Sequence, residues 1–328
     1  MNSKHAPVAL FAWQRPEHTR MVLKALLRNP EAGSTDLYAF VDGPRNERES
    51  AISREVIEVI NNSTGFRSTQ LIVSPVNRGL ANSITQGVST VVDERDRVIV
   101  IEDDIVVTPN FLGYMNTALD MYADDESVAS IHGYCYPVTQ PLPTTFFIRG
   151  ADCWGWATWS RAWRHFNPDG AALLQAIAES GSADQFDFDG TAGYLDMLDK
   201  QVQGKVDSWA VRWYAATFLD GMYTLYPGAS LVENIGMDGT GRHSGLSDHF
   251  EVTVDSSPRT LTRIPIQDSA QGRQAFTEFF LAMNDDRNLP FARRWLRRSA
   301  RMLGRVLPEQ SRSALIKAMP ARVKRLLK

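Results

Sequence analysis

Three consecutive acidic residues, Glu102-Asp103-Asp104, follow the apolar run at residues 98–101 and are called the acidic cluster below. An apolar run of this length is typical of a buried strand, so the carboxylates are expected where that strand reaches the surface. Carboxylates about 4 Å apart repel by roughly 4 kcal/mol at an effective dielectric near 20. They stay ionised together only beside a cation or good hydrogen-bond donors. The acidic cluster therefore predicts a cation site.

Oxygen ligands of this kind suit Mn²⁺ or Mg²⁺ rather than zinc. Side chains alternate along an extended segment, which would place Glu102 and Asp104 on one face and Asp103 on the other. The alternative interpretation is a solvated turn whose acids help to start a helix with Pro109 at its first position.

Short apolar strands alternate with helical patterns over the first hundred residues. Strands are expected at residues 8–13, 37–41, 71–73 and 98–101, with helices from 19, through 52–60 and from 80. This rhythm is typical of a parallel α/β sheet, and ligands of such sheets bind outside the carboxyl ends of the strands. Polar or flexible residues follow all four strands: Trp13-Gln14-Arg15-Pro16, Asp42-Gly43, Asn77-Arg78-Gly79 and the acidic cluster. The four strand ends are expected to form one site.

The second half of the chain is organised differently. A helix near 110–122 and a strand near 128–131 are expected before the Pro-rich segment 137–143, which is expected to begin a second lobe. That lobe is expected to contain helices near 194–203 and 208–219 and a strand near 223–226. Segment 150–159 combines glycine with three tryptophans, which indicates a ligand-facing loop with Trp156 among its contacts. The alternative is that the tryptophans fill the core.

Composition limits the class of protein. The 328 residues carry a net charge of −3 and are 43% hydrophobic, which suits one elaborate domain or two small ones. Two cysteines are too few for a disulfide framework and lack zinc-site spacing, so thiols are expected. No stretch of eighteen apolar residues occurs, and residues 1–6 lack the apolar segment of a secretory signal. A cytosolic protein is therefore expected.

Residues 291–328 contain twelve Lys or Arg residues and a single acid. Their spacing predicts a basic amphipathic helix, which is expected to lie on an anionic membrane surface with Phe291 and Trp295 at the interface. Docking on the acidic body of the chain or on a partner is the alternative. Nucleic acid is not expected, because the remainder is acidic and offers no second basic surface.

Residues 7–245 carry these motifs in an order that resembles nucleotide-sugar-dependent glycosyltransferases of the GT-A fold. The resemblance is strongest to bacterial family-2-like enzymes related to N-acetylglucosaminyltransferase I. The segments that carry the resemblance are 8–16, 40–43, 77–80 and 101–112. It implies a Rossmann-like, mostly parallel central sheet flanked by helices. We accordingly expect a nucleotide-sugar half at 1–136, an acceptor-binding and catalytic half at 137–265, and a C-terminal helical region at 266–328. The resemblance weakens past residue 245 and does not explain the basic tail that ends this region.

The resemblance also implies roles for individual residues. Asp104 would ligate the Mn²⁺ or Mg²⁺ that bridges the diphosphate, Asp103 would contact the ribose or a metal-bound water, and Glu102 would approach the donor sugar. Asp42 would meet the nucleotide base. Further donor contacts would come from Trp13, Arg15, Asn77 and Arg78. Surface salt bridges are the alternative for both arginines.

Segment 205–209 resembles the family's helix-opening segment that carries the catalytic base, here Asp207. An aspartate at that position is alternatively only the cap of a helix beginning at Ser208. Asp152 is the rival base. Segment 227–244 contains four glycines and resembles the flexible region that closes over the donor. His243 would there complete the metal shell or contact phosphate, and a structural histidine is the alternative.

The function implied is a metal-dependent, inverting transfer of a sugar from a nucleoside diphosphate sugar, with a UDP-sugar as the first choice. The acceptor would be a hydroxyl of a glycan or a lipid-linked saccharide, in surface polysaccharide synthesis at the cytosolic membrane face. A sugar nucleotidyltransferase is one alternative, although its Gly-rich first loop is missing from residues 12–16. A catalytically silent sugar-nucleotide sensor or membrane scaffold is another.

Overall fold

The computed structural model describes residues 5–237, 249–257 and 260–288. Two compact units divide the chain, at residues 1–277 and 278–328. The strands and helices that position the candidate site all belong to the first unit. The expected amphipathic tail at 291–328 lies outside the described residues, and so does His243.

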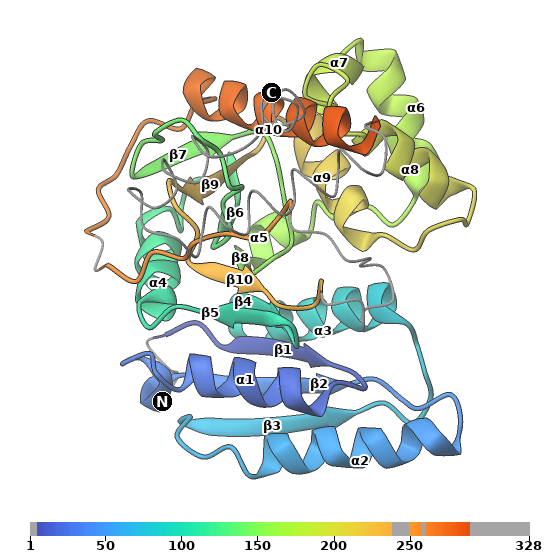
Figure 1. The fold of residues 1–328 in the computed structure, drawn as a ribbon, viewed down its shortest axis with the longest axis vertical. Coiled ribbons are helices and arrows are strands. Elements are labelled where there is room, and N and C mark those ends of the chain that lie inside the picture. Colours follow the sequence, from blue (N-terminus) through green and yellow to red (C-terminus); the bar gives the residue numbers. More distant parts are fainter. Residues whose placement is uncertain (1–4, 238–248, 258–259, 289–328) are drawn as a thin grey trace, which may run out of the picture. The chain divides into compact units, whose positions relative to one another are not determined.

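An eight-stranded sheet with the order β3-β2-β1-β4-β8-β6-β9-β7 forms the centre of the first unit (Figure 1). Six strands run in one direction, whereas β8 and β7 run antiparallel to their neighbours. The fold is therefore mixed α/β with a largely parallel sheet, as expected, and is consistent with a Rossmann-like GT-A fold. The strands are β1 (Val8–Ala12), β2 (Asp36–Val41), β3 (Ser68–Val73), β4 (Arg97–Glu102), β6 (Val128–His132), β7 (Thr145–Ile148), β8 (Trp156–Trp159) and β9 (Tyr223–Pro227).

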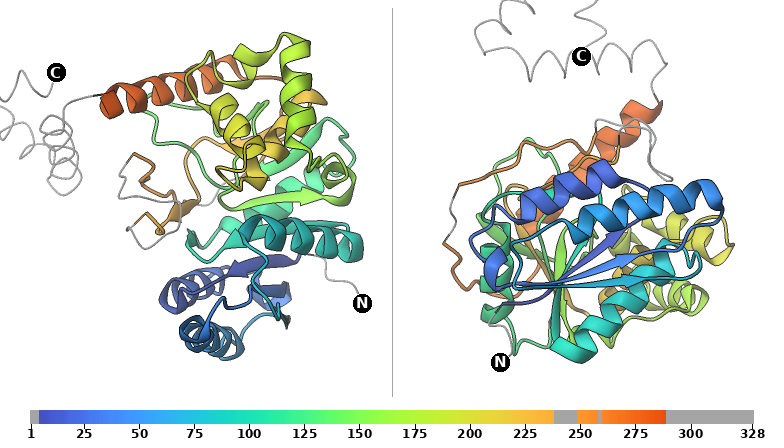
Figure 2. Two further views of the ribbon diagram at one scale, coloured as in Figure 1. Left: turned by 90° about the vertical axis from the view of Figure 1, so that its right-hand side faces the viewer. Right: turned by 90° about the horizontal axis from the view of Figure 1, so that it is seen from below.

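Helices cover both faces of this sheet. Figure 2 shows α1 and α2 on one face of the parallel strands and α3 on the other. The helices are α1 (Pro16–Leu26), α2 (Glu47–Asn61), α3 (Leu80–Arg95), α4 (Phe111–Met121), α5 (Ser160–Trp163), α6 (Gly170–Ser180), α7 (Ala183–Phe186), α8 (Tyr194–Val202), α9 (Trp209–Leu219) and α10 (Ala270–Asn288). Within the described ranges, no helix combines the length and the apolar character needed to cross a membrane.

The strands form where they do because their side chains can be buried. Every residue of β1 and the four central residues of β4 are buried, and β-branched residues dominate the latter. The sheet continues across residues 137–143, so both expected halves of the chain contribute strands to it. The Pro-rich segment joins β6 to β7 rather than separating two sheets.

One element after the acidic cluster was not expected. The short strand β5 (Ile105–Val107) lies between the cluster and α4, and it pairs antiparallel with β10 (Val232–Asn234) in a separate two-stranded sheet. Three residues are too few to show a strand period in the sequence, and the pairing partner lies far along the chain. This small sheet brings residues 232–236 to the end of β4.

Asp36, at the amino end of β2, holds a charged network far from the acidic cluster. Its side chain is 3% exposed and accepts hydrogen bonds from Arg67, Ser68 and Arg95. Burial alone would raise the pKa of Asp36, but these three donors outweigh it and lower the pKa from 3.8 to about 2. The folded state therefore favours the ionised carboxylate.

We expect Asp36→Asn to lower the free energy of unfolding by about 2 kcal/mol at pH 7, because the depressed pKa stabilises the folded state wherever the unfolded chain is ionised. The difference from the wild type should shrink as the pH falls from about 4 to about 2. Urea unfolding of both proteins across this range measures it. Asp120→Asn, which removes an exposed partner of Arg97, is the control and should cost well under 1 kcal/mol. A pH-independent difference would contradict the account.

Candidate functional site

The carboxyl ends of β1 to β4 lie at one edge of the sheet. The register pairs Ala12 with Val41 and Val41 with Val73, so β1, β2 and β3 end side by side. Phe11 pairs with Glu102, the last residue of β4. The four polar strand ends are therefore neighbours, as their place in the sequence predicted.

The acidic cluster is held by the segment that follows β1. The backbone N–H of Trp13 donates to Asp103 Oδ2 at 2.8 Å. Arg15 Nη1 lies 2.7 Å from Asp104 Oδ2 and 3.8 Å from Asp103 Oδ1. The expected alternation of the three acids is wrong, because β4 ends at Glu102 and the two aspartates occupy a turn. One arginine can therefore reach both of them.

Electrostatics within the cluster favour a positive partner. Burial, followed by the charges of Asp104 and Asp103, raises the pKa of Glu102 well above its ordinary value. Burial and the Asp104 charge raise the pKa of Asp103 to about 7, although the Trp13 N–H and Arg15 oppose the shift. Negative charge is thus costly at this position, and a bound cation would lower that cost.

The residues present fit a metal ion that arrives with a phosphate-bearing ligand. Nowhere in the described residues do three or more His, Cys, Asp or Glu side chains gather as a complete metal site. Mg²⁺ commonly uses only one or two carboxylates together with substrate phosphates, and Asp103 and Asp104 supply that number. Arg15 already occupies Asp104, so a cation would compete with it for this carboxylate.

The segment after β10 packs closely against Asp104. Ile235 donates its backbone N–H to the Asp104 carbonyl at 2.9 Å. A Cβ atom at Gly236 would lie only 2.1 Å from Asp104 Oδ2, so any larger residue would displace the carboxylate. The position of Asp104 therefore depends on a chain segment that is distant in sequence.

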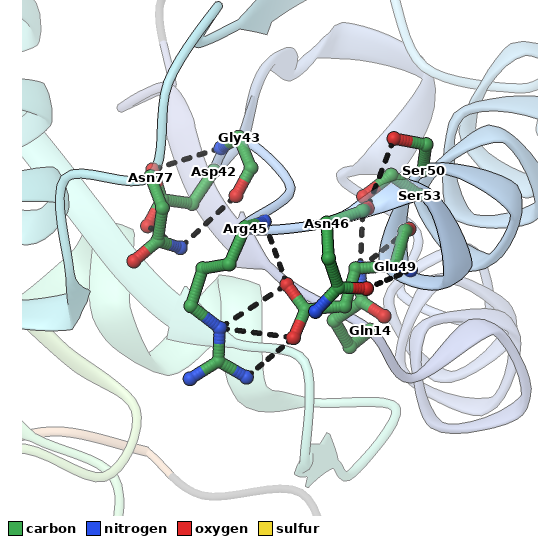
Figure 3. A network of polar contacts seen from close by, with 9 residues as sticks. All are labelled: Gln14, Asp42, Gly43, Arg45, Asn46, Glu49, Ser50, Ser53 and Asn77. Atoms are coloured by element: carbon green, nitrogen blue, oxygen red, sulfur yellow. Dashed lines mark hydrogen bonds and ion pairs between the residues drawn. The ribbon is translucent and has the colours of Figure 1, made fainter.

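Asp42 forms a second hydrogen-bonded centre, at the end of β2 (Figure 3). Its Oδ1 accepts from the backbone N–H groups of Gly43 and Arg78, both at 2.9 Å. Its Oδ2 accepts from Asn77 Nδ2 at 2.9 Å and from the Gly79 N–H at 3.0 Å. The carboxylate thus ties the loop after β3 to the end of β2. The Arg78 side chain itself points to Gln86 on α3.

Asp207 lies beside this loop. A Cβ atom at Gly79, whose φ is +79°, would lie 3.9 Å from Asp207 Oδ2. The Asp207 side chain is 60% exposed and lies 3.6 Å from Arg212 Nη2. Ser208, not Asp207, caps α9, because its side chain accepts from the Val211 N–H at 3.3 Å. The alternative role of Asp207 as the helix cap is therefore not what the structure shows.

Asp152 is enclosed by hydroxyl groups. Tyr136 donates to Oδ1 at 2.5 Å, Tyr226 donates to Oδ2 at 2.9 Å, and the Tyr194 hydroxyl lies 3.4 Å from Oδ1. Burial and the charge of Asp152 raise the pKa of all three tyrosines, which keeps them protonated as donors. The same segment lies near the acidic cluster: burial, then the charges of Glu102, Asp152 and Asp104, raise the pKa of the Cys153 thiol.

The structure does not bring Trp156 to this site. Trp156 begins β8, is 0% exposed and stacks on Trp209 at 5.4 Å between ring centroids. Trp163 and Trp213 complete this buried group. The expectation of a ligand contact is corrected in favour of core packing, because the antiparallel pairing of β8 with β4 and β6 buries the ring.

Two residues at the strand ends were missed. Arg45 lies over the Trp13 ring at 4.7 Å and pairs with Glu49 in the first turn of α2. Arg45 and Glu49 are four residues apart at the start of a helix, a spacing that favours an ion pair and could have been recognised in the sequence. The contact with Trp13 had no sequence signal, because it joins segments that follow two different strands.

No family model matches the chain, and no curated protein matches it. Similar solved structures include residues 1–349 of TarS from S. aureus (10% identity, TM-score 0.33, covering 53% of this chain and 49% of that one). They also include UDP-glucose pyrophosphorylase complexed with UDP-glucose (11% identity, TM-score 0.35, covering 68% and 90%). A mycobacterial protein is similar as well (12% identity, TM-score 0.30, covering 49% and 54%).

The chain spans about half the length of the TarS structure that it matches.

Gly236→Ala should displace the Asp104 carboxylate and lower the free energy of unfolding by about 1–3 kcal/mol, because the added methyl group overpacks this contact. Gly33→Ala is the matched control: its nearest neighbouring atom lies 3.9 Å away, so it should be close to neutral. Urea unfolding of both variants checks the prediction. If the Gly236→Ala and Gly33→Ala variants were equally stable, the segment after β10 would be able to move away from the added methyl group at no cost, which would contradict the prediction.

Proposed function

We propose that this chain is a glycosyltransferase that moves a sugar from a nucleoside diphosphate sugar to a hydroxyl of a glycan or lipid-linked saccharide. One observation carries the proposal. A half-buried acidic cluster paired with Arg15 lies at the same sheet edge as an exposed carboxylate, Asp207, that is held beside the loop after β3. The first feature suits a metal–diphosphate group, and the second suits an acceptor hydroxyl.

The donor end of the site is built by the segments after β1 and β4. Asp104, with Asp103, would hold Mn²⁺ or Mg²⁺, and the bound ion would neutralise charge on the departing nucleoside diphosphate. Arg15 offers a second positive charge at the same place, since its guanidinium already lies between the two aspartates. Glu102, at the end of β4, would lie beside the donor sugar.

The acceptor end of the site would be Asp207. Its carboxylate would take the proton of the acceptor hydroxyl as that oxygen forms a bond to the anomeric carbon. The bond from the anomeric carbon to the diphosphate would break, and the nucleoside diphosphate would leave with the electron pair. A single base of this kind fits an inverting transfer. Arg212 donates to the Ser208 and Pro168 carbonyls and so restrains the backbone beside Asp207.

Asp152 is the weaker candidate for the base. Two tyrosine hydroxyls donate to its carboxylate at 2.9 Å or less, and a third lies at 3.4 Å. These hydroxyl groups occupy the carboxylate oxygens and so leave less room for a substrate hydroxyl to approach them. Asp207 is more exposed, and its only described partner is Arg212. The geometry therefore favours Asp207.

Donor binding is the first test. With Mn²⁺ present, the protein should bind a UDP-, GDP- or dTDP-sugar in a thermal-shift screen. Asp104→Asn should weaken the metal-dependent part of that binding by roughly 10–100-fold, because a metal-holding carboxylate is lost. Asp93→Asn, on an exposed position of α3, is the control. Metal-dependent binding that is unchanged in Asp104→Asn would refute the proposed cation site.

The base assignment is tested by turnover. Asp207→Asn should lower kcat by roughly 10²–10⁴-fold while donor affinity stays near the wild-type value, because proton removal acts in the chemical step. Ser208→Ala should instead cost about 1 kcal/mol of stability through the lost cap, with little change in kcat. If Asp207→Asn and Ser208→Ala lower kcat equally, Asp207 affects turnover only by stabilising the start of α9, and the base assignment is refuted.

Products separate the competing activities. A glycosyltransferase releases nucleoside diphosphate when the acceptor is added. A sugar nucleotidyltransferase instead converts the donor to nucleoside triphosphate when pyrophosphate is supplied. Tight donor binding without either product would identify a sensor or scaffold. The proposed lipid-linked acceptor and the peripheral position on the cytosolic membrane face rest on residues 291–328, which lie outside the described residues.

A further inference from the structure

The hydrogen-bonding capacity of Asp42 is fully used inside the protein. An ionised carboxylate has about four lone-pair sites, and Asp42 accepts four hydrogen bonds from three backbone N–H groups and one side-chain amide. Accepting from the N–H of a nucleotide base would require one of these donors to give way. Asp42 therefore positions the loop after β3, and recognition of the base falls to another residue at these strand ends.

Arg45 is the residue whose geometry suits that task. It follows β2 in the same turn as Asp42, and its guanidinium lies over the Trp13 ring at 4.7 Å from the ring centroid. Its Nε and Nη2 atoms donate to Glu49 at 2.9 and 2.5 Å. Contacts on a ring and on a carboxylate restrain both the position and the direction of the guanidinium.

One edge of this guanidinium remains unused. The Arg45 side chain is 42% exposed, whereas that of Glu49 is 12% exposed. Nη1 makes no hydrogen bond or ion pair with the residues that the structure describes, and Figure 3 shows it pointing away from Glu49. Arginine therefore offers N–H donors to a ligand beside Trp13, and a matching ligand must present acceptor oxygens or nitrogens.

We propose that Arg45 reads the base of the nucleotide donor by donating from Nη1 to a carbonyl oxygen on the edge of the base. Uracil, thymine, guanine and cytosine all carry such an oxygen, whereas adenine carries none. The proposed function supplies the ligand, so this inference rests on it. Arg45 discriminates against adenine nucleotides and leaves the diphosphate to Arg15, which follows β1, and to the metal ion that the acidic cluster at the end of β4 would hold.

The competing role for Arg45 is purely structural. Its pair with Glu49 links the turn after β2 to the start of α2, where Asn46 is the cap. A residue with that role alone would affect stability and leave nucleotide selectivity intact. A phosphate contact would affect every phosphate-bearing ligand equally. Ligands with and without a base, and with and without a phosphate, distinguish these roles.

Calorimetry with UDP, GDP, ADP, uridine and pyrophosphate, in Mn²⁺ buffer, is the test. The wild type should prefer UDP or GDP to ADP. Arg45→Lys keeps a positive charge but loses the planar fork. It should weaken UDP and uridine binding by roughly tenfold, remove the preference over ADP and leave pyrophosphate binding unchanged. Arg45→Ala should do the same. Arg20→Ala, an exposed arginine of α1 paired with Glu17, is the control.

Several results would overturn the inference. UDP affinity that is unchanged in both Arg45 variants would leave Arg45 only its structural role. An equal loss for UDP and pyrophosphate, with uridine unaffected, would make Arg45 a phosphate contact. A wild type that prefers ADP would refute the selectivity. A wild type that binds no nucleotide would refute the proposed function together with this inference, whereas unchanged variants of a binding wild type would refute the inference alone.

Discussion

The site depends on the cost of keeping negative charge at the end of β4, where water is largely excluded. Asp103 is 8% exposed, and its neighbours in the acidic cluster add to the repulsion. The Trp13 N–H and the Arg15 guanidinium offset part of that cost. This compensation couples the segment after β1 to the turn after β4. It also explains why the cluster attracts further positive charge, whether from a metal ion or from a ligand that brings one.

Carboxylates at this sheet edge divide into those that build the protein and those that remain available to a ligand. Asp42 is saturated by donors of the chain and therefore fixes a loop. Asp152 is likewise engaged by tyrosines, which fixes the segment before β8. Asp104 shares a single arginine with Asp103, and Asp207 lies exposed beside Arg212. The number of hydrogen-bond partners that a carboxylate has within the protein therefore distinguishes structural carboxylates from candidate ligand-binding or catalytic ones better than residue type does.

Strand pairing between segments distant in sequence determines whether the aromatic-rich segment 150–159 lies in the core or at the site. Glycine and tryptophan at residues 150–159 looked suited to a ligand, yet β8 pairs with β4 and β6 and places Trp156 in the core. The sequence shows that rings are abundant but not which face of the sheet they occupy. Arg45 illustrates the converse, because an unremarkable charged residue lies over Trp13 only when β1 and β2 lie side by side.

The strands β1 to β4, their helices and the convergence of four polar strand ends are predictable from the amino-acid sequence, because apolar periodicity is local and alternating strands and helices form a parallel sheet. The remaining features of the site depend on contacts between distant segments. Arg15 reaches both aspartates because a turn replaces the last residues of an extended segment, and Gly236 is required because β10 pairs with β5. Asp42 holds the loop after β3 because the backbone N–H groups of Arg78 and Gly79 converge on its carboxylate. Such contacts join residues that are distant in sequence, and no local pattern encodes them.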